Sequence, residues 1–351
     1  MICFHNDYSE GCHEAILQRL VQTNAEQTPG YGEDVYCAGA ADKIRKACGD
    51  ETLDVHFLVG GTQTNLTVIA SALRPYQGVI APETAHIHVH ETGAVEAAGH
   101  KVLACPSEDG TVTAQQVEAA VLAQRDSGCA EHMVMPKMVY ISHPTELGTL
   151  YTLQQLRDLR QVCDQYGLYL FLDGARLGYG LMAQGSDVTL QDIARLCDVF
   201  YIGGTKMGAL FGEAVVIRND ALKPDFRYMI KQRGGMLAKG RLLGLQFDTL
   251  FTDGLYFELG RHADAMADRI RAVFTRYAVP MVAENATNQI FPILPDAVLE
   301  ALDGDFTYTY QFRVDAGHRC VRFCTSWATT PQQVDALCGR LEDLLQGCKN
   351  S

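Results

Sequence analysis

The chain has 351 residues, of which 47% are hydrophobic and 20% are charged, a composition typical of a folded globular protein. Its length is enough for one large domain and a smaller one. The formal net charge of −13 disfavours nucleic acids and anionic membranes as main partners, and no apolar run approaches the length of a membrane span.

Twelve cysteines are scattered through apolar and helix-like segments, and no two of them have the spacing C-x-x-C. The first residues, MICFHNDYSEG, lack the basic stretch and apolar run of a signal peptide. We therefore expect reduced thiols and a cytoplasmic location.

Up to about residue 220, short apolar runs alternate with amphipathic stretches, which is typical of a mainly parallel sheet covered by helices. Seven strands are predicted, at 55–59, 78–81, 100–104, 138–142, 168–172, 199–203 and 214–218. Helices are predicted between them, at 64–73, 114–123, 152–166 and 190–197. The expected fold class is α/β, with a seven-stranded sheet.

The pattern changes beyond about residue 240. Two helix-like stretches lie within 242–277, with Gly254 and Gly260 as candidate breaks, and strand-like runs follow at 289–294 and 319–324. A last helix is predicted over 332–345, because Thr330-Pro331 is a helix start signal. We expect a large domain over residues 1–245, N-terminal segment included, and a small C-terminal α+β domain over 246–351.

The most informative segment is LYLFLDGAR, residues 168–176. It predicts a buried parallel strand with Asp173 at its carboxyl end, where open α/β sheets bind ligands. A carboxylate there costs desolvation free energy unless a cation pairs with it, and the candidates are a protonated ring nitrogen and Arg176. The alternative interpretation is an Asp-Gly turn that binds nothing.

A second buried strand, 199–203, is followed closely by Lys206 in the sequence Gly-Gly-Thr-Lys. One predicted helix separates it from the Asp173 strand, and the right-handed crossover of such a βαβ unit puts Asp173 and Lys206 at the same sheet edge. Partial desolvation there lowers the pKa of an amine and makes it nucleophilic toward an aldehyde. A lone lysine would instead be interpreted as an ordinary solvated side chain.

The turn Gly60-Gly61-Thr62-Gln63-Thr64-Asn65 leads from the 55–59 strand into the next helix. Its glycines and free N–H groups favour a phosphate, although it is neither a Walker A loop nor a G-x-G-x-x-G motif. The turn, Asp173 and Lys206 together match the phosphate, ring nitrogen and aldehyde of pyridoxal 5′-phosphate (PLP). The residues therefore predict PLP as the cofactor.

With these elements the chain resembles the threonine aldolase (β-eliminating lyase) family of fold-type I PLP enzymes, from about Phe4 to Trp327. The segments that carry the resemblance are Gly30-Tyr31-Gly32-Glu33-Asp34, the turn at 60–65, Ala85-His86, Glu91-Thr92-Gly93, Asp173-Gly174-Ala175-Arg176 and Lys206. The resemblance implies an aspartate-aminotransferase-like large domain, and a homodimer or homotetramer with its sites at the subunit interface.

The resemblance also implies how the cofactor is held. Lys206 forms the Schiff base, Asp173 holds the pyridine nitrogen and Arg176 contacts the region of the ring. Gly61 and Thr62 hold the phosphate. No metal is expected.

On the substrate side, the resemblance implies that His86 stacks on the ring and that Arg322 binds the α-carboxylate through its planar guanidinium. Asn6 stands near that carboxylate, and Tyr31 approaches from the facing subunit. His143 fills the place of the family's second pocket histidine. The family's usual Ser-Asp-Thr near the N-terminus is Asn6-Asp7-Tyr8 here, so substrate contacts are expected to differ.

The implied activity is that of a low-specificity L-threonine/L-allo-threonine aldolase, which cleaves β-hydroxy-α-amino acids to glycine and an aldehyde. His86, His143 or a bound water is the candidate base for the β-hydroxyl proton. An aminotransferase, a racemase or a β-eliminating lyase would use the same cofactor apparatus, and analysis of the products separates these alternatives.

A different class of function is suggested by His86-Ile87-His88-Val89-His90, because alternating histidines on a strand can ligate a metal. This metal-dependent hydrolase would leave Asp173, Lys206 and the glycine-rich turn unexplained. A non-catalytic binding module is disfavoured because so many reactive side chains converge on one sheet edge.

Overall fold

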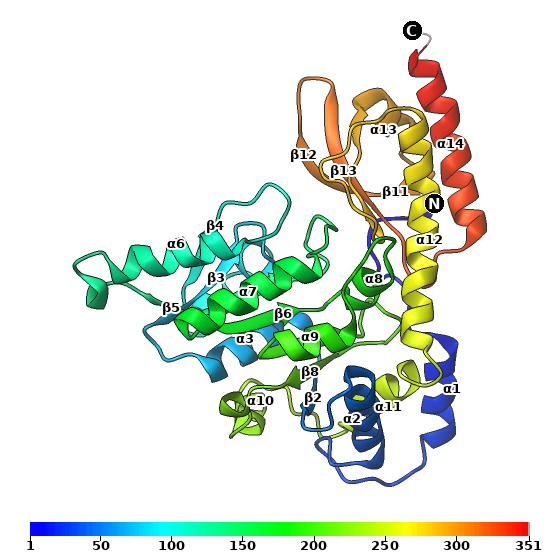
Figure 1. Cartoon of the computed structure of the whole chain (residues 1–351). Coiled ribbons are helices and arrows are strands. Elements are labelled where there is room, and N and C mark those ends of the chain that lie inside the picture. The colour runs from blue at the N-terminus through cyan, green and yellow to red at the C-terminus, as the bar shows by residue number, and fades with distance from the viewer. Residues whose placement is uncertain (350–351) are drawn as a thin grey trace.

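The computed structural model describes residues 1–349. A seven-stranded sheet with helices on both faces forms the larger part of the molecule, and the C-terminal elements form a second part beside it (Figure 1). Among the described residues, none of the helices combines the length and apolarity that crossing a membrane would require.

All seven predicted strands form, and they form one sheet in the order β2-β8-β7-β6-β5-β3-β4. Their bounds are β2 (Asp54–Leu58), β3 (Gln77–Pro82), β4 (Val102–Cys105), β5 (Met135–Ser142), β6 (Tyr169–Asp173), β7 (Val199–Gly203) and β8 (Glu213–Ile217). Only β8 runs antiparallel to its neighbours, β2 and β7. The start of β8 therefore lies at the same edge as the carboxyl ends of the other strands.

The helices of this part are α1 (Glu14–Thr23), α2 (Val35–Cys48), α3 (Gly61–Ala72), α4 (His86–Val89), α5 (Ala94–Ala97), α6 (Ala114–Arg125), α7 (Leu153–Tyr166), α8 (Leu177–Met182), α9 (Leu190–Leu196), α10 (Phe226–Gln232) and α11 (Arg241–Leu250). Short 3₁₀ helices lie at Ala130–His132 and Asp220–Leu222. Capping boxes begin α6, α7 and α9, since a threonine in each case exchanges hydrogen bonds with the third helical residue.

Alternation along the strands divides the core between the two faces of the sheet. Leu170 and Leu172 of β6 point to one hydrophobic cluster, whereas Phe171 points to the other, together with Tyr201 of β7. Asp173 continues this alternation onto the Phe171 face, where α3 packs. The ligand-facing groups are therefore expected on the α3 side of the carboxyl edge.

The C-terminal part contains a four-stranded antiparallel sheet and three helices. Their bounds are β9 (Gln289–Ile290), β10 (Ile293–Pro295), β12 (Thr309–Arg313), β13 (His318–Cys324), α12 (Leu255–Arg276), α13 (Asp296–Leu302) and α14 (Pro331–Lys349). Gly254 caps α12 in a left-handed conformation, so the candidate break there is confirmed. Gly260 instead lies inside α12, where a Cβ would come within 2.5 Å of the Gly178 carbonyl oxygen on α8.

The change from one hydrophobic core to the other occurs along α12. Tyr256 and Ala263 belong to a core of the large sheet, whereas Met266 and Ile270 belong to the core of the C-terminal part. The N-terminus also lies in the second part, because β1 (Ile2–Cys3) pairs with β11 (Phe306–Thr307). The predicted boundary after residue 245 falls inside α11, which packs against α2 of the large part.

Candidate active site

A cavity of about 330 Å³ opens at the carboxyl edge of the large sheet, on the side of α3. Its lining comes from the ends of β2, β5, β6 and β7, from the start of β8 and from the N-terminal segment. The residues are Tyr8, Val59, Gly60, Gly61, Thr62, His86, Ser142, Pro144, Thr145, Glu146, Asp173, Ala175, Arg176, Tyr201, Thr205, Lys206, Phe211 and Glu213. Six of the ten predicted site residues line this cavity: Gly61, Thr62, His86, Asp173, Arg176 and Lys206.

Asp173 ends β6 and is almost completely buried. Its Oδ2 accepts hydrogen bonds from the Tyr140 hydroxyl and the Asn65 amide, and its Oδ1 accepts one from the Ala175 backbone N–H. No cationic side chain of residues 1–347 forms an ion pair with it. A buried carboxylate without a cation is costly, so a cationic ligand group facing Asp173 would lower the free energy of this arrangement.

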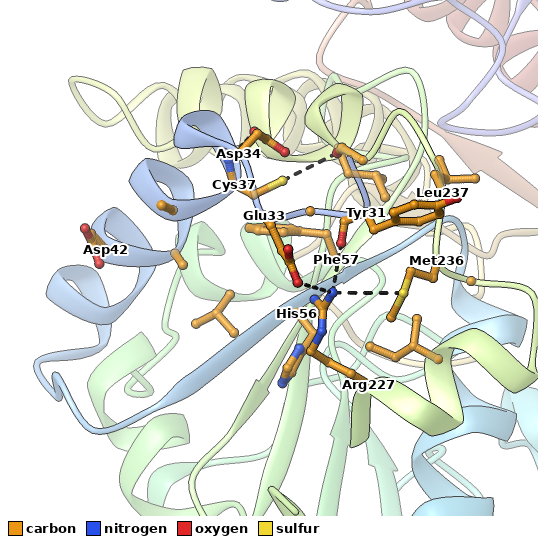
Figure 2. A pocket seen from close by; sticks show the side chains of 18 of the residues that line it. Tyr31, Glu33, Asp34, Cys37, Asp42, His56, Phe57, Arg227, Met236 and Leu237 are labelled. Carbon is orange, nitrogen blue, oxygen red and sulfur yellow. Dashed lines mark hydrogen bonds and ion pairs between the residues drawn. The ribbon is translucent and has the colours of Figure 1, made fainter. Parts of the chain in front are cut away.

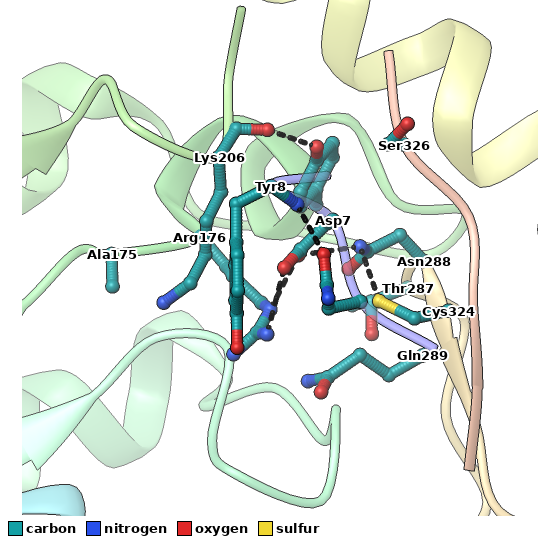
Figure 3. A network of polar contacts seen from close by, with 12 residues as sticks. Asp7, Tyr8, Ala175, Arg176, Lys206, Thr287, Asn288, Gln289, Cys324 and Ser326 are labelled. Carbon is teal, nitrogen blue, oxygen red and sulfur yellow. Dashed lines mark hydrogen bonds and ion pairs between the residues drawn. The ribbon is translucent and has the colours of Figure 1, made fainter. Parts of the chain in front are cut away.

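Lys206 follows β7 in the loop Gly204-Thr205, which lies next to the end of β6 as the βαβ argument predicts. Two helices, α8 and α9, lie between the strands rather than the one predicted. Burial, together with the Arg176 guanidinium, lowers the pKa of the Lys206 amine, against the opposing effect of nearby carboxylates. Figure 3 shows Lys206, Arg176 and Tyr8 converging on the same space. The amine is therefore suited to attack a carbonyl carbon.

The start of α3 forms an anion-binding turn. Gly60 is the N-cap and offers no side-chain hydrogen bond, and the first intrahelical bond begins at the Thr64 N–H. The preceding N–H groups are free to bind an anion at the positive end of the helix dipole. A Cβ on Gly61 would lie 3.2 Å from the Tyr201 hydroxyl, so glycine keeps this approach open.

Arg176 is paired inside the protein rather than with Asp173. Its Nε and one terminal nitrogen donate to the Asp7 carboxylate at 2.7 and 3.0 Å, and Asn288 donates to the same carboxylate at 3.0 Å (Figure 3). Burial alone would raise the pKa of Asp7, but the Arg176 guanidinium and the Lys206 amine lower it below its usual value. This buried pair ties the N-terminal segment and the C-terminal part to the cavity.

His86 begins α4 beside the cavity, and its Nδ1 lies 2.8 Å from the Glu91 carboxylate. Asn65 donates to the same Glu91 oxygen at 2.7 Å and to Asp173 at 3.2 Å. These contacts orient the imidazole and leave its Nε2 for a ligand. Glu91 and Asn65 were present in the quoted motifs, but only the fold reveals that they connect His86 to Asp173.

Two further buried carboxyls in the lining, Glu146 and Glu213, were not predicted. Burial raises the pKa of both above the usual value, and the Asp173 carboxylate adds to the rise. Glu146 accepts hydrogen bonds from Ser142 and from the His86 backbone N–H. The one signal for Glu213 was a charged residue at the first position of an apolar strand, seven positions after Lys206.

Four predicted site residues lie outside this lining. His143 is fully buried; burial lowers its pKa to about 4, and its imidazole packs near Gly180 rather than facing the cavity. The Asn6 side chain accepts hydrogen bonds from Tyr8 and Ser9 within its own turn. Arg322 lies on β13, bonded to Gln289 and to the His5 carbonyl oxygen.

Tyr31 is the fourth. It is 46% exposed and lies beneath the Lys231 ammonium, which is 4.7 Å from the centre of its ring. Within a single chain it does not reach the Lys206 cavity. An exposed position is what an approach to the site of a neighbouring subunit requires.

The histidine run does not form the strand that a metal site would need. Residues His86–Val89 are the short helix α4, so the alternation of a strand is absent. Among the side chains of residues 1–347, no group of three or more His, Cys, Asp or Glu residues is arranged to hold a metal ion. Eleven of the twelve cysteines lie in the described side chains, and all eleven are free thiols.

Comparison with known sequences gives consistent matches. The family model described as β-eliminating lyase matches residues 6–296. The chain is 31% identical over 335 residues to the low specificity L-threonine aldolase of Pseudomonas sp. (strain NCIMB 10558), covering 95% of this chain and 94% of that protein. The protein of the same name from Pseudomonas aeruginosa is 29% identical over 335 residues, with the same coverage.

Solved structures agree with the sequence matches. The structure of Leishmania major threonine aldolase superposes with a TM-score of 0.96 at 46% identity, covering 98% of this chain and 100% of that chain. An aspartate aminotransferase of Thermus thermophilus superposes with a TM-score of 0.72 at 15% identity, covering 98% and 91%. At that identity the second match shows the shared fold alone, and it confirms the aspartate-aminotransferase-like architecture.

Proposed function

The chain belongs to the β-eliminating lyase family, and on that premise we propose that it is a PLP-dependent aldolase that cleaves β-hydroxy-α-amino acids to glycine and an aldehyde. The relatives named for L-threonine aldolase activity support this substrate class. The observation that carries the proposal is the pairing, in one cavity, of the buried Asp173 carboxylate with the desolvated Lys206 amine.

The residues of the cavity fit PLP. The free N–H groups at Gly61 and Thr62 would hold its phosphate, Asp173 its protonated ring nitrogen and Lys206 its aldehyde carbon. No cationic side chain of residues 1–347 pairs with Asp173, so a pyridinium that faced this carboxylate would neutralise it. When bound, the cofactor supplies an electron sink for the negative charge that develops at the substrate Cα.

The chain's own residues would orient the substrate and move its protons. We assign His86 as the group that faces the ring and accepts the β-hydroxyl proton, since Glu91 fixes its Nδ1 and His143 does not line the cavity. The Arg322 guanidinium would bind the α-carboxylate, with Asn6 nearby. Arg176 positions the N-terminal segment through Asp7 rather than acting on the ring alone.

We further propose a homodimer or homotetramer in the cytoplasm, in which Tyr31 completes the site of a neighbouring subunit. The exposure of Tyr31 and its distance from the cavity of its own chain support this arrangement. Size measurement in solution, combined with activity of mixed Tyr31→Ala and Lys206→Ala oligomers, tests it. Recovery of activity in the mixture is expected if the two residues act across an interface.

Reductive trapping tests the proposed function directly. The purified protein should absorb visible light, and borohydride treatment followed by peptide mapping should place the label on Lys206. L-Threonine or L-allo-threonine should then yield glycine and acetaldehyde. A keto acid as the product would favour an aminotransferase or a β-eliminating lyase, and change of configuration alone would favour a racemase.

A further inference from the structure

Glu213 occupies a position between the two cofactor-binding loops. It is the first residue of β8, and its register partners are Leu58 at the end of β2 and Gly203 at the end of β7. The chain after Leu58 becomes the anion-binding turn at Gly60–Thr62, and the chain after Gly203 leads to Lys206. The antiparallel direction of β8 is what brings a strand start, and this carboxyl, to the ligand-binding edge.

The carboxyl of Glu213 is incompletely satisfied by the protein. It is 4% exposed and lines the cavity. Its Oε1 accepts a hydrogen bond from the Thr205 hydroxyl at 3.2 Å, whereas its Oε2 is buried without a partner among the described residues. Glu213 lines the ligand cavity, so a carboxyl oxygen that lacks a protein partner there is available to bond to the ligand.

Burial, rather than the surrounding charges, favours the neutral form of Glu213. Burial raises its pKa above the usual value and the Asp173 carboxylate raises it further, while the Lys206 amine opposes them. Lys206 forms no ion pair with Glu213, and its own charge is disfavoured by burial and by Arg176. Arg176 pairs with Asp7, which leaves Lys206 as the cation whose charge lowers the pKa of Glu213.

We propose that Glu213 acts as a carboxylic acid that donates a hydrogen bond from Oε2 to the phosphate of the cofactor. The inference rests on the proposed function, in which that phosphate lies at Gly61 and Thr62. The two basic side chains that line this cavity are Arg176, which pairs with Asp7, and Lys206, which serves the aldehyde in the proposed function. A protonated carboxyl supplies a donor there, whereas an ionised one would repel the phosphate.

The proposal makes cofactor binding depend on one proton. The hydrogen bond is present at a pH below the pKa of Glu213 in the cofactor-free protein, and it is lost as the pH rises through that value. Glu213→Gln keeps an N–H donor at the same place but cannot ionise. The affinity of wild type for PLP, relative to that of E213Q, should therefore fall about tenfold per pH unit in the alkaline range.

Phosphorus NMR of the holoenzyme tests the contact without relying on activity. Between about pH 6 and about pH 10, the resonance of the bound phosphate should shift with a transition in wild type that is absent in E213Q. Glu146→Gln is the matched control, since it removes a second buried carboxyl of the same cavity, and its transition should match that of wild type. Glu213→Asp should retain a transition at a displaced pH.

The alternative role of Glu213, as a proton partner of Lys206, gives a different result. In that case E213Q would move the pH transition of the visible absorption band and leave the phosphorus titration unchanged, which would overturn the proposal. A flat phosphorus titration in wild type would overturn it too, even if E213Q failed to fold. A wild-type protein that binds no PLP would instead overturn the proposed function, and this inference with it.

Discussion

Two cavities of nearly equal volume lie in the molecule, about 330 Å³ around Lys206 and about 300 Å³ beside the edge strand β2. In the second cavity, several polar groups bond to one another (Figure 2), although Asp34 Oδ2 and His56 Nε2 have no partner among the described residues. Arg227 donates to Glu33 and to the Tyr31 carbonyl oxygen, and Cys37 donates to the Gly240 carbonyl oxygen. Asp34 caps α2 through the N–H groups of its first turn.

The titratable groups of the two cavities are also held differently. Burial lowers the pKa of His56 to about 4 and raises that of the Cys37 thiol, so both are neutral in the second cavity. The first cavity instead holds the Asp173 carboxylate and the Lys206 amine without ion pairs, at the edge where parallel strands end. The difference teaches that unsatisfied charge at a carboxyl edge, rather than cavity volume, identifies the reactive site.

The largest difference between the two cavities is expected when one residue in each of them is substituted. Lys206→Ala should lower kcat by about 10⁴-fold or more, because the covalent attachment point is lost. His56→Gln, in the second cavity, should leave kcat unchanged and affect only thermal stability. Steady-state kinetics and thermal unfolding of both variants measure this, and a large loss of kcat in H56Q with a normal Tm would contradict the assignment.

Asp173→Asn should have the next largest effect. The amide has a similar shape but no negative charge to hold a protonated ring nitrogen, so kcat should fall by about 10³-fold and PLP should bind more weakly. Equilibrium dialysis with PLP and steady-state kinetics check this. If D173N had the kcat and the PLP affinity of wild type, the negative charge of Asp173 would have no role in holding the cofactor.

Asp7→Asn probes how the charged cavity is supported. Removing one partner of the buried Asp7–Arg176 pair should destabilise the fold by about 3 kcal/mol at neutral pH, since the guanidinium stays buried without its counter-ion. Because folding lowers the pKa of Asp7, the pair's contribution is present above the unfolded pKa and is lost as pH falls through the lower folded value.

Urea unfolding of wild type and D7N at several pH values measures that dependence. The difference in the free energy of unfolding should narrow below about pH 4. Asp296→Asn, which breaks partly exposed pairs with Arg313 and Arg319, is the matched control and should cost less free energy of unfolding. Equal losses in the two variants would show that burial of the Asp7 pair has no special effect.

The smallest expected effect is on substrate choice. Tyr8 lines the Lys206 cavity where the family usually has a threonine, so Tyr8→Thr should enlarge the space beside the substrate. We expect kcat/KM for β-hydroxy-amino acids with bulky side chains to rise by about tenfold relative to threonine. Kinetics with a series of such substrates tests this, and an unchanged ranking would exclude Tyr8 from specificity.

The regular parts of the fold could be predicted from local pattern. Strands 199–203 and 138–142 are apolar runs bounded by polar or turn residues, and α7 has both a capping threonine and helical periodicity. The alternative interpretation of His86–His90 as a strand was wrong, because His86–Val89 form the short helix α4 after β3. An alternation of only five residues is too short to predict a strand reliably. The helix α2 was not predicted, although Asp34 caps its first turn.

The sequence by itself determined that Asp173 and Lys206 meet at one edge of the sheet, because they follow consecutive parallel strands and chain connectivity alone brings such positions together. Only the tertiary structure decided which carboxyls and histidines share that cavity. Burial of Glu213, the pairing of Arg176 with Asp7 and the turning of His143 into the core all depend on segments distant in the chain. The protonation state of a side chain follows from what surrounds it, and that surrounding exists only in the folded protein.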